Sequence, residues 1–318
     1  MIIILIVQAL FGLVSPLNKQ ALTLCSAAFF VAGKLLSAGI LLLLYHFYRH
    51  GALSTIPRRH WPYYFQIIVI GNFCAHFLKY WGLQHVSATK MALIFNTSPF
   101  FVALFSYFFF GNRLTRMQCA GLFISFIGLI PVLVGSCPEE LHMGEFCTLS
   151  WPEFAIIVAT IFHALSMISK RILMQENAYW PVQVNAISFL GGGLLAALYV
   201  GVMQADNLPD VNVLPVLTGY ILLTTIISKV ICSTLYLRLM KYYTTTFLAF
   251  MDYWYVLFVA FWSWLFWGEH VTMYFWLSAL IVFCGQYLFY RQELYATKAH
   301  SEPLNVEEEQ EEELEPEE

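Results

Sequence analysis

The sequence is poor in charge. Only 11% of its 318 residues are Asp, Glu, Lys or Arg, against about 25% in an ordinary soluble domain. Ten of its 20 acidic residues lie at or beyond Glu302, so residues 1–301 have 16 basic and 10 acidic residues and a net charge of +6. Apolar and aromatic residues make up 59% and run through the whole body of the chain. This balance excludes a water-solvated globule and a protein with a single membrane anchor, and it leaves a polytopic membrane protein with an acidic tail.

Several functional motifs are also missing. No Cys/His cluster has the spacing of metal ligands, and no Gly-x-x-x-x-Gly-Lys sequence binds nucleotide phosphates. We find no pairing of a nucleophile with a base, so we expect no catalytic residue, no metal, no cofactor and no nucleic-acid partner. The cysteines give little indication of function. Cys137 and Cys147 share one loop and could form a disulfide in an oxidising compartment.

Long apolar runs are what the chain does have. A helix that crosses about 30 Å of hydrocarbon needs about 20 mostly apolar residues, whereas the strands of a membrane barrel are about 10 residues long with alternating polarity. Turn signals divide the chain into ten segments of the helical kind: 2–22, 27–48, 62–83, 88–110, 117–136, 152–173, 181–203, 214–237, 244–267 and 273–291. We therefore predict an all-α polytopic membrane protein with ten transmembrane helices.

Basic residues predict the orientation of these helices. If the N-terminus is cytoplasmic, eleven Lys and Arg residues fall in loops and span ends on that side and three on the other. We expect a multi-pass protein of the bacterial cytoplasmic (inner) membrane, as a monomer or homodimer in the lipid bilayer, with both termini in the cytoplasm. The first segment is not read as a secretion signal, since it lacks a positive leader and a small-x-small cleavage site.

The second half of the sequence repeats the first. Residues 101–115 match residues 258–272 at seven of 15 positions, at an offset of 157, and Gly128 and Gly285 keep that offset. The first and sixth segments align at an offset of 151, and the third and eighth at 156. Because each copy has an odd number of spans, the second copy must enter the membrane with the opposite orientation. Such inverted repeats are the architecture of alternating-access carriers, whose central site opens to each side in turn.

Four motifs carry a resemblance to a known family. The first span ends in Ser15-x-x-x-Lys19, and the fourth ends in Gly111-Asn112-Arg113-Leu114 and is followed by Gly121 and Gly128. The second copy reads Gly268-Glu269-His270 and then Gly285. With the five-plus-five repeat, this pattern resembles the drug/metabolite transporter superfamily, in particular its ten-helix EamA type, over roughly residues 2–291. Asn112 and Lys34 depart from the usual Glu and Arg and put family assumptions about ion coupling in doubt.

The repeat and the resemblance together imply a domain organisation. We expect a first EamA-like repeat at 1–136, an outer loop at 137–151, a second repeat at 152–291 and an acidic, disordered cytoplasmic tail at 292–318. Ten Glu and two Pro between Glu302 and Glu318 favour a solvated terminus over a folded one.

Polar residues inside the spans indicate where a solute could bind, because they are costly in hydrocarbon and turn toward the bundle interior. They form stripes at helical spacing, and Lys229 and Asp252 lie on consecutive helices and could pair. Asp252 is followed by aromatic residues, which suits an amine or another organic cation. The candidate substrate-binding residues are Ser15, Asn72, His76, Asn96, His163, Ser166, Lys229, Tyr236, Asp252 and Trp254.

Three functions remain open at this point. The first is a secondary transporter of a small polar organic metabolite. Some members of the resembled family export amino acids or toxic amines, and others, in intracellular bacteria, exchange S-adenosylmethionine. The alternatives are an intramembrane enzyme that acts on a lipid-linked substrate and a non-transporting membrane subunit.

Overall fold

The structure is a computed structural model. It describes residues 2–86, 88–111, 113–131, 150–175, 179–204, 209–267 and 276–289. Cys137 and Cys147, which could form a disulfide, the turn at Gly268-Glu269-His270 and the acidic tail lie outside the described residues.

The first half of the chain folds into five helical segments. The first two are α1 (Ile2–Leu22) and α2 (Ala27–His50), and the third joins η1 (Arg58–His60), α3 (Trp61–Gln66), the π-helical η2 (Ile67–Cys74) and α4 (Ala75–His85). The fourth is broken into α5 (Ala88–Phe95) and α6 (Ser98–Phe110), and the fifth is α7 (Arg116–Ile127).

The second half follows the same plan. Its first two segments are α10 (Trp151–Gln175) and α11 (Pro181–Met203), and its third joins α12 (Leu214–Thr225), the π-helical η5 (Ile226–Cys232) and α13 (Ser233–Leu239). The fourth is broken into α14 (Thr245–Met251) and α15 (Tyr253–Trp267), and a last helix spans Trp276–Phe289. Both third segments contain a π-helical stretch, and both fourth segments break, so the halves share their irregularities as well as their helices.

These elements form a polytopic membrane protein. Within the described residues, seven helical segments are long and apolar enough to cross a membrane, and Arg116–Ile127 and Trp276–Phe289 are shorter apolar helices. Together with the third segment, they occupy the ten expected positions. Large apolar side chains such as Phe108 and Leu198 are exposed on the outside, at 70% and 64%, while Gln8, Asn72 and Thr224 are buried. A soluble protein buries its apolar side chains and exposes its polar ones. The opposite arrangement seen here suits a protein whose outer surface contacts lipid.

Local chemistry sets several helix ends. The hydroxyl of Ser26 accepts a hydrogen bond from the backbone N–H of Phe29 and so caps α2, and Thr115 and Gln118 form a capping box at the start of α7. Gly111 ends α6 with a φ of +68°, a left-handed conformation that glycine adopts without strain. Pro99 lies at the start of α6, just after the break between α5, which ends at Phe95, and α6, which begins at Ser98.

Helices α2 and α11 pack through pairs of residues that the repeat relates to each other. A Cβ atom on Gly39 would lie 2.7 Å from the backbone nitrogen of Leu190, and one on Gly193 would lie 2.7 Å from that of Leu36. At an offset of 154, Gly39 corresponds to Gly193 and Leu36 to Leu190, so the two contacts are copies of each other. This reciprocity is characteristic of an interface on a twofold axis. The Gly191-Gly192-Gly193 run therefore allows close helix packing.

The helix pair of α7 and Trp276–Phe289 shows the same reciprocity. A Cβ atom on Gly128 would lie 3.1 Å from the backbone nitrogen of Val282, and one on Gly285 would lie 2.8 Å from that of Ser125. Both pairs are related by the offset of 157 found in the sequence. Two further pairs of contacts correspond in the same way: α1 packs on α15 as α10 packs on α6, and α1 packs on η5 as α10 packs on η2. The packing therefore has the twofold symmetry expected of the repeat.

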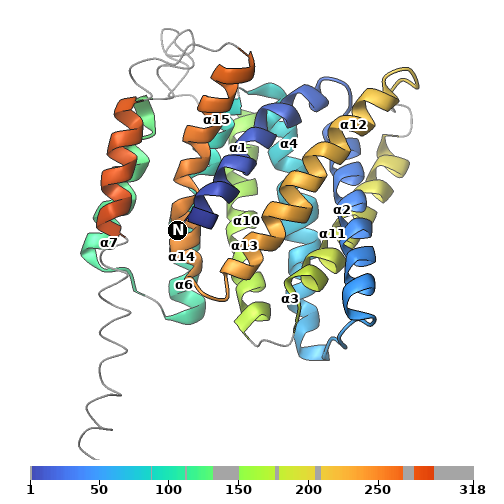
Figure 1. The fold of residues 1–318 in the computed structure, drawn as a ribbon, viewed down its shortest axis with the longest axis horizontal. Coiled ribbons are helices and arrows are strands. Elements are labelled where there is room, and N and C mark those ends of the chain that lie inside the picture. Colours follow the sequence, from blue (N-terminus) through green and yellow to red (C-terminus); the bar gives the residue numbers. More distant parts are fainter. Residues whose placement is uncertain are drawn as a thin grey trace, which may run out of the picture.

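The two halves run in opposite directions (Figure 1). Near the end of α1, Lys19 donates a hydrogen bond to the carbonyl of Val86, 3.0 Å away. Close by, Lys90 forms an ion pair with Glu153 at the start of α10, with 2.6 Å between Nζ and Oε1. The end of α1 and the start of α10 therefore lie at the same end of the molecule, which we call the α1-end. The repeat is inverted.

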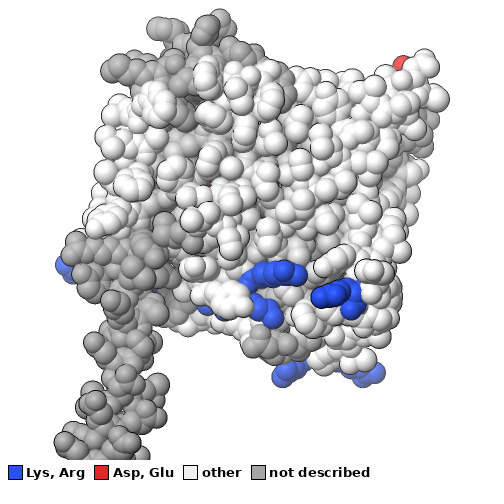
Figure 2. Space-filling model, viewed as in Figure 1, with Lys and Arg blue, Asp and Glu red and all other residues white. Residues whose placement is uncertain are grey.

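Basic side chains gather at the opposite end of the molecule. In Figure 2 the Lys and Arg atoms cluster near the lower edge, where α3 begins, and a broad band without charged atoms lies above them. Arg49 lies in the last turn of α2, Arg58 and Arg59 in η1, and Arg238 in the last turn of α13. The uncharged band has the character of a surface that faces lipid.

Candidate functional site

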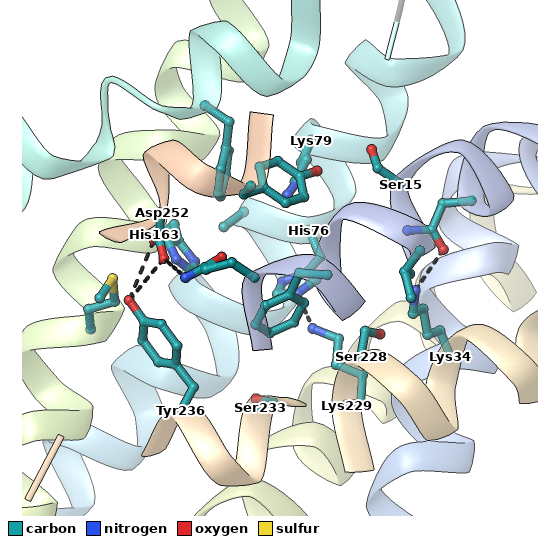
Figure 3. A pocket seen from close by; sticks show the side chains of 18 of the residues that line it. Ser15, Lys34, His76, Lys79, His163, Ser228, Lys229, Ser233, Tyr236 and Asp252 are labelled. Carbon is teal, nitrogen blue, oxygen red and sulfur yellow. Dashed lines mark hydrogen bonds between the residues drawn. The ribbon is translucent and has the colours of Figure 1, made fainter. Parts of the chain in front are cut away.

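A cavity lies between the two halves, in the middle of the helix bundle. It is lined by side chains from α1, α2, α4, α5, α10, α11, η5, α13 and α15, so both repeats contribute (Figure 3). Seven of the ten candidate residues lie on its wall: Ser15, His76, Asn96, His163, Lys229, Tyr236 and Asp252.

Asp252 lies at the break between α14 and α15, where the chain leaves one helix and starts the next. Its Oδ1 accepts a hydrogen bond of 2.5 Å from the side-chain amide of Gln8. The hydroxyl of Tyr236 lies 3.3 and 3.4 Å from the two carboxylate oxygens. Tyr236 in turn makes an edge contact with the ring of Phe11. The carboxylate is thus held by neutral donors from α1 and α13.

Lys229, on η5, reaches across the cavity to His76 on α4. The Nδ1 atom of His76 lies 3.0 Å from the carbonyl of Gly71, which is an acceptor, so Nδ1 carries the proton. The lone pair on Nε2 of His76 then accepts from the Lys229 ammonium. Lys229 also lies over the ring of Phe189, 5.0 Å from its centroid. Both of these contacts are with uncharged groups.

Three more lysines line the cavity. Lys34, on α2, is 1% exposed and donates a hydrogen bond of 2.7 Å to Asn18 Oδ1. Lys79, on α4, lies over the ring of Phe95, 3.7 Å from its centroid, and Lys170 lies on α10. Among the described residues that line the cavity, Asp252 is the sole carboxylate, so the wall carries four lysines and one acidic group.

The other candidates on the wall offer polar atoms. The hydroxyl of Ser15 is buried beside Tyr255. The Oδ1 atom of Asn96 is buried and has no hydrogen-bond partner in the described part of the protein, while its amide nitrogen donates to the carbonyl of Ala92, one turn earlier. His163 packs on Phe95, with 5.0 Å between the ring centroids. Buried polar atoms without partners are costly unless a ligand or water meets them.

Three candidates lie outside the cavity. Asn72 faces α11, where a Cβ atom on Gly192 would lie 2.7 Å from its own Cβ, and Ser166 packs against Gly71. Trp254 turns to the last helix and donates its indole N–H to Gln286. These three residues support the packing between helices.

The expected pairing of Lys229 with Asp252 is wrong. Lys229 bonds His76, whereas Asp252 bonds Gln8 and Tyr236. In Figure 3 the two residues lie on different sides of the cavity. Sequence can place two residues on consecutive helices, but it does not fix the rotation and depth of each helix.

Several cavity residues were absent from the candidate set: Gln8, Asn18, Lys34, Lys79, Lys170, Asn185, Ser228, Ser233 and Tyr255. Gln8 and Lys79 belong to stripes at helical spacing with other candidates, so a stricter use of that spacing would have found them. Lys170 occupies the repeat position of Lys19. Asn185 and Ser228 have no comparable signal.

A cavity lined by polar and apolar side chains of two inverted five-helix repeats is typical of a membrane carrier. The model of the EamA-like transporter family matches residues 1–134 and 150–291, and the chain belongs to this family. It is a transporter of a small metabolite, not an enzyme, and an integral multi-pass membrane protein.

Two curated relatives and one solved structure extend the comparison. The chain is 26% identical over 256 residues to an S-adenosylmethionine/S-adenosylhomocysteine transporter of Chlamydia muridarum, covering 80% of this chain and 79% of that one. It is 26% identical over 259 residues to the protein of the same name from Chlamydia trachomatis serovar L2, at 80% and 77% coverage. A crystal structure aligns with a TM-score of 0.71 at 15% identity, over 90% of this chain and 94% of that one, and shares the fold.

Proposed function

We propose that this protein is a secondary carrier that exchanges an adenosyl amino acid, S-adenosylmethionine or S-adenosylhomocysteine, by alternating access. The observation that carries the proposal is the mixed wall of the cavity, where lysines, one carboxylate and aromatic rings lie together between the halves. An adenosyl amino acid needs these three kinds of group: lysine for its carboxylate, aspartate for its cationic centre, and aromatic faces for its adenine. The names of the relatives point to the same substrates.

The substrate-binding roles follow from the cavity. Asp252, held by Gln8 and Tyr236, faces the cationic end of the solute, and the Lys229–His76 pair faces its anionic end. Phe95 and Tyr255 offer rings between these ends, with Lys79 lying over both. Ser15, Asn96 and His163 supply further polar contacts.

Contacts at the α1-end support alternating access. Lys19 bonds the carbonyl of Val86, Gln84 donates to the carbonyls of Leu22 and Cys25, and Lys90 pairs with Glu153. These contacts tie α1 to α4, and α5 to α10, above the cavity. In our proposal they break when the cavity opens toward the α1-end.

The placement in the membrane is part of the proposal. The basic end of the molecule faces the cytoplasm, as does the N-terminus, and the protein lies in a bacterial inner membrane as a monomer or homodimer. The proposed repeats span 1–136 and 152–291, joined by an outer loop at 137–151, and the acidic tail at 292–318 is cytoplasmic. Deletion of the tail is expected to leave transport intact.

Counterflow tests the proposed function. The purified protein is reconstituted in liposomes loaded with unlabelled S-adenosylhomocysteine, and uptake of labelled S-adenosylmethionine is followed. We expect accumulation that empty liposomes and liposomes loaded with spermidine or leucine do not show. Equal uptake under all loading conditions, or accumulation with leucine or spermidine alone, would refute the adenosyl substrate.

A further inference from the structure

Two buried lysines in the cavity have more donors than partners. Lys34 and Lys229 are 1% and 9% exposed. An ammonium group has three N–H donors, but Lys34 bonds only Asn18, and Lys229 only His76, among the described residues. Both partners are neutral. Two donors of each lysine remain for a ligand.

The two lysines are neighbours in the fold although the chain separates them widely. Helix α2 packs on η5, and the hydroxyl of Thr225 donates to the backbone carbonyl of Lys34, 3.4 Å away. Lys229 follows Thr225 by four residues, in the π-helical segment η5. Figure 3 shows Lys34 and Lys229 together at one side of the cavity, with Asp252 at the other.

Aromatic rings and polar groups surround this pair. Lys34 lies 5.3 and 5.6 Å from the ring centroids of Phe30 and Tyr80, and Lys229 lies over Phe189. One turn before Phe189, Asn185 lines the cavity with both atoms of its amide buried and without a partner in the described structure. Burying ammonium groups away from a counter-charge is unfavourable. A carboxylate, which accepts about four hydrogen bonds, matches the donors left over.

We propose that Lys34 and Lys229, with Asn185, form the carboxylate subsite of the carrier, and that the carboxylate is the group on which recognition of the solute depends. The inference rests on the proposed function and specifies it. The positive centre of the solute contributes less to recognition than its carboxylate does. The reason is that the described cavity wall has a single carboxylate, Asp252, and four lysines. The carrier therefore binds S-adenosylhomocysteine at least as tightly as it binds S-adenosylmethionine, which carries a sulfonium.

The first test changes the ligand and leaves the protein intact. Competition against labelled S-adenosylmethionine is measured on the full-length protein with three compounds: S-adenosylhomocysteine, its primary carboxamide and its desamino analogue. The carboxamide keeps the shape and loses the negative charge. We expect it to bind at least tenfold more weakly than the parent acid, and the desamino analogue to lose less than the carboxamide.

The second test changes the lysines. Lys34→Met and Lys229→Met keep most of the length of the side chain and remove its charge, and Lys241→Met removes an exposed lysine as the matched control. We expect the two cavity variants to bind the acid and its carboxamide with nearly equal affinity, and the control to keep the wild-type ratio. Lys229→Arg, which keeps the charge, is expected to recover part of that ratio. A variant that is merely misfolded would lose affinity for the acid and for the carboxamide by the same factor.

The outcomes separate the subsite from the proposed function. Equal binding of acid and carboxamide by the wild type, or an unchanged ratio in both Met variants, overturns the subsite while adenosyl transport stands. Failure of every adenosyl compound to bind overturns the proposed substrate, and the same comparison with methionine and methioninamide then decides the subsite.

Discussion

The two halves of the molecule agree in packing and differ in chemistry. Each half contributes the same contact at the seam between α2 and α11, and each third segment contains a π-helical stretch, η2 or η5. Tyr80 and Tyr236 on the cavity wall are equivalent, but most polar groups of the cavity are not copied in this way. Asp252 corresponds to Phe95, and Lys229 to Phe73.

Further pairs follow the same rule. Lys79 corresponds to Leu235, His163 to Gly12 and Gln8 to Ala159. The duplicated scaffold fixes where helices bend and meet, so substitutions there must suit both halves. The solute is asymmetric, and each of its groups needs a partner from only one half. Symmetry therefore belongs to the scaffold and asymmetry to the site.

Of the changes that test this comparison, Asp252→Asn is expected to have the largest effect on uptake. It removes the single acidic group on the described cavity wall but keeps the side-chain shape, and we expect uptake to fall about fivefold, which corresponds to about 1 kcal/mol and is less than the loss expected when the carboxylate of the solute is neutralised. Asp210→Asn, which makes the same change at an exposed position away from the cavity, is the matched control and should retain most of the uptake. Proteoliposome uptake normalised to inserted protein measures both. Equal losses in the two variants would show that the effect does not come from the position of Asp252 in the cavity.

Gly39→Ala and Gly193→Ala test the symmetry of the scaffold. The added methyl group would meet a backbone nitrogen of the facing helix at 2.7 Å in either case, so each change should cost about 1–3 kcal/mol of stability by overpacking. The thermal unfolding midpoint of the purified protein in detergent should fall by similar amounts in both variants. Gly201→Ala, on α11 with nothing within 4 Å of the new atom, is the control. A large drop in one of the two variants alone would contradict the reciprocal contact.

The ion pair between Lys90 and Glu153 has no copy in the other half, where Phe247 and Ile2 stand at the equivalent positions. Lys90→Met or Glu153→Gln should ease opening at the α1-end and speed the labelling of Met91→Cys in the cavity several-fold. The double variant should resemble either single one, with a coupling energy of about 1 kcal/mol. Labelling by an impermeant thiol reagent, compared with protein that lacks Met91→Cys, measures the effect. Additive changes would mean that the two residues act independently.

Ser125→Ala should have the smallest effect. The Ser125 hydroxyl lies 3.2 Å from the carbonyl of Val282, to which it donates. Val282 lies inside a helix whose own hydrogen bonds use the same carbonyl, so the loss should be about 0.5 kcal/mol in the free energy of unfolding. Chemical denaturation in detergent checks it. A loss several times larger would make this hydroxyl a principal link between α7 and the last helix.

The sequence was sufficient for the scaffold. Apolar runs of about 20 residues place the ten segments, and the offsets of 151, 156 and 157 between matching residues identify the repeat. Such features depend on local composition and on alignment. The inverted orientation follows from the odd number of spans, and the contacts of Lys19 and Lys90 at one end of the molecule agree with it.

The site was only partly predictable because helical spacing changes along the spans. Asn72 lies in η2, where a π-helix turns less per residue than an α-helix. Counting four residues from Asn72 to His76 therefore puts both on one face in the sequence but not in the structure. Trp254 follows the break at Asp252, where the helix begins anew and the spacing restarts. The pairing of Lys229 with Asp252 failed for a related reason, since rotation and depth come from tertiary packing.

The reciprocal glycine contacts have a mechanical consequence for an alternating carrier. When two equivalent halves trade conformations, a contact that is its own counterpart is the same before and after the trade. The lines along which α2 meets α11, and α7 meets the last helix, can thus remain still while the helices around the solute tilt. These two helix interfaces can therefore keep the same geometry in both end states of the transport cycle.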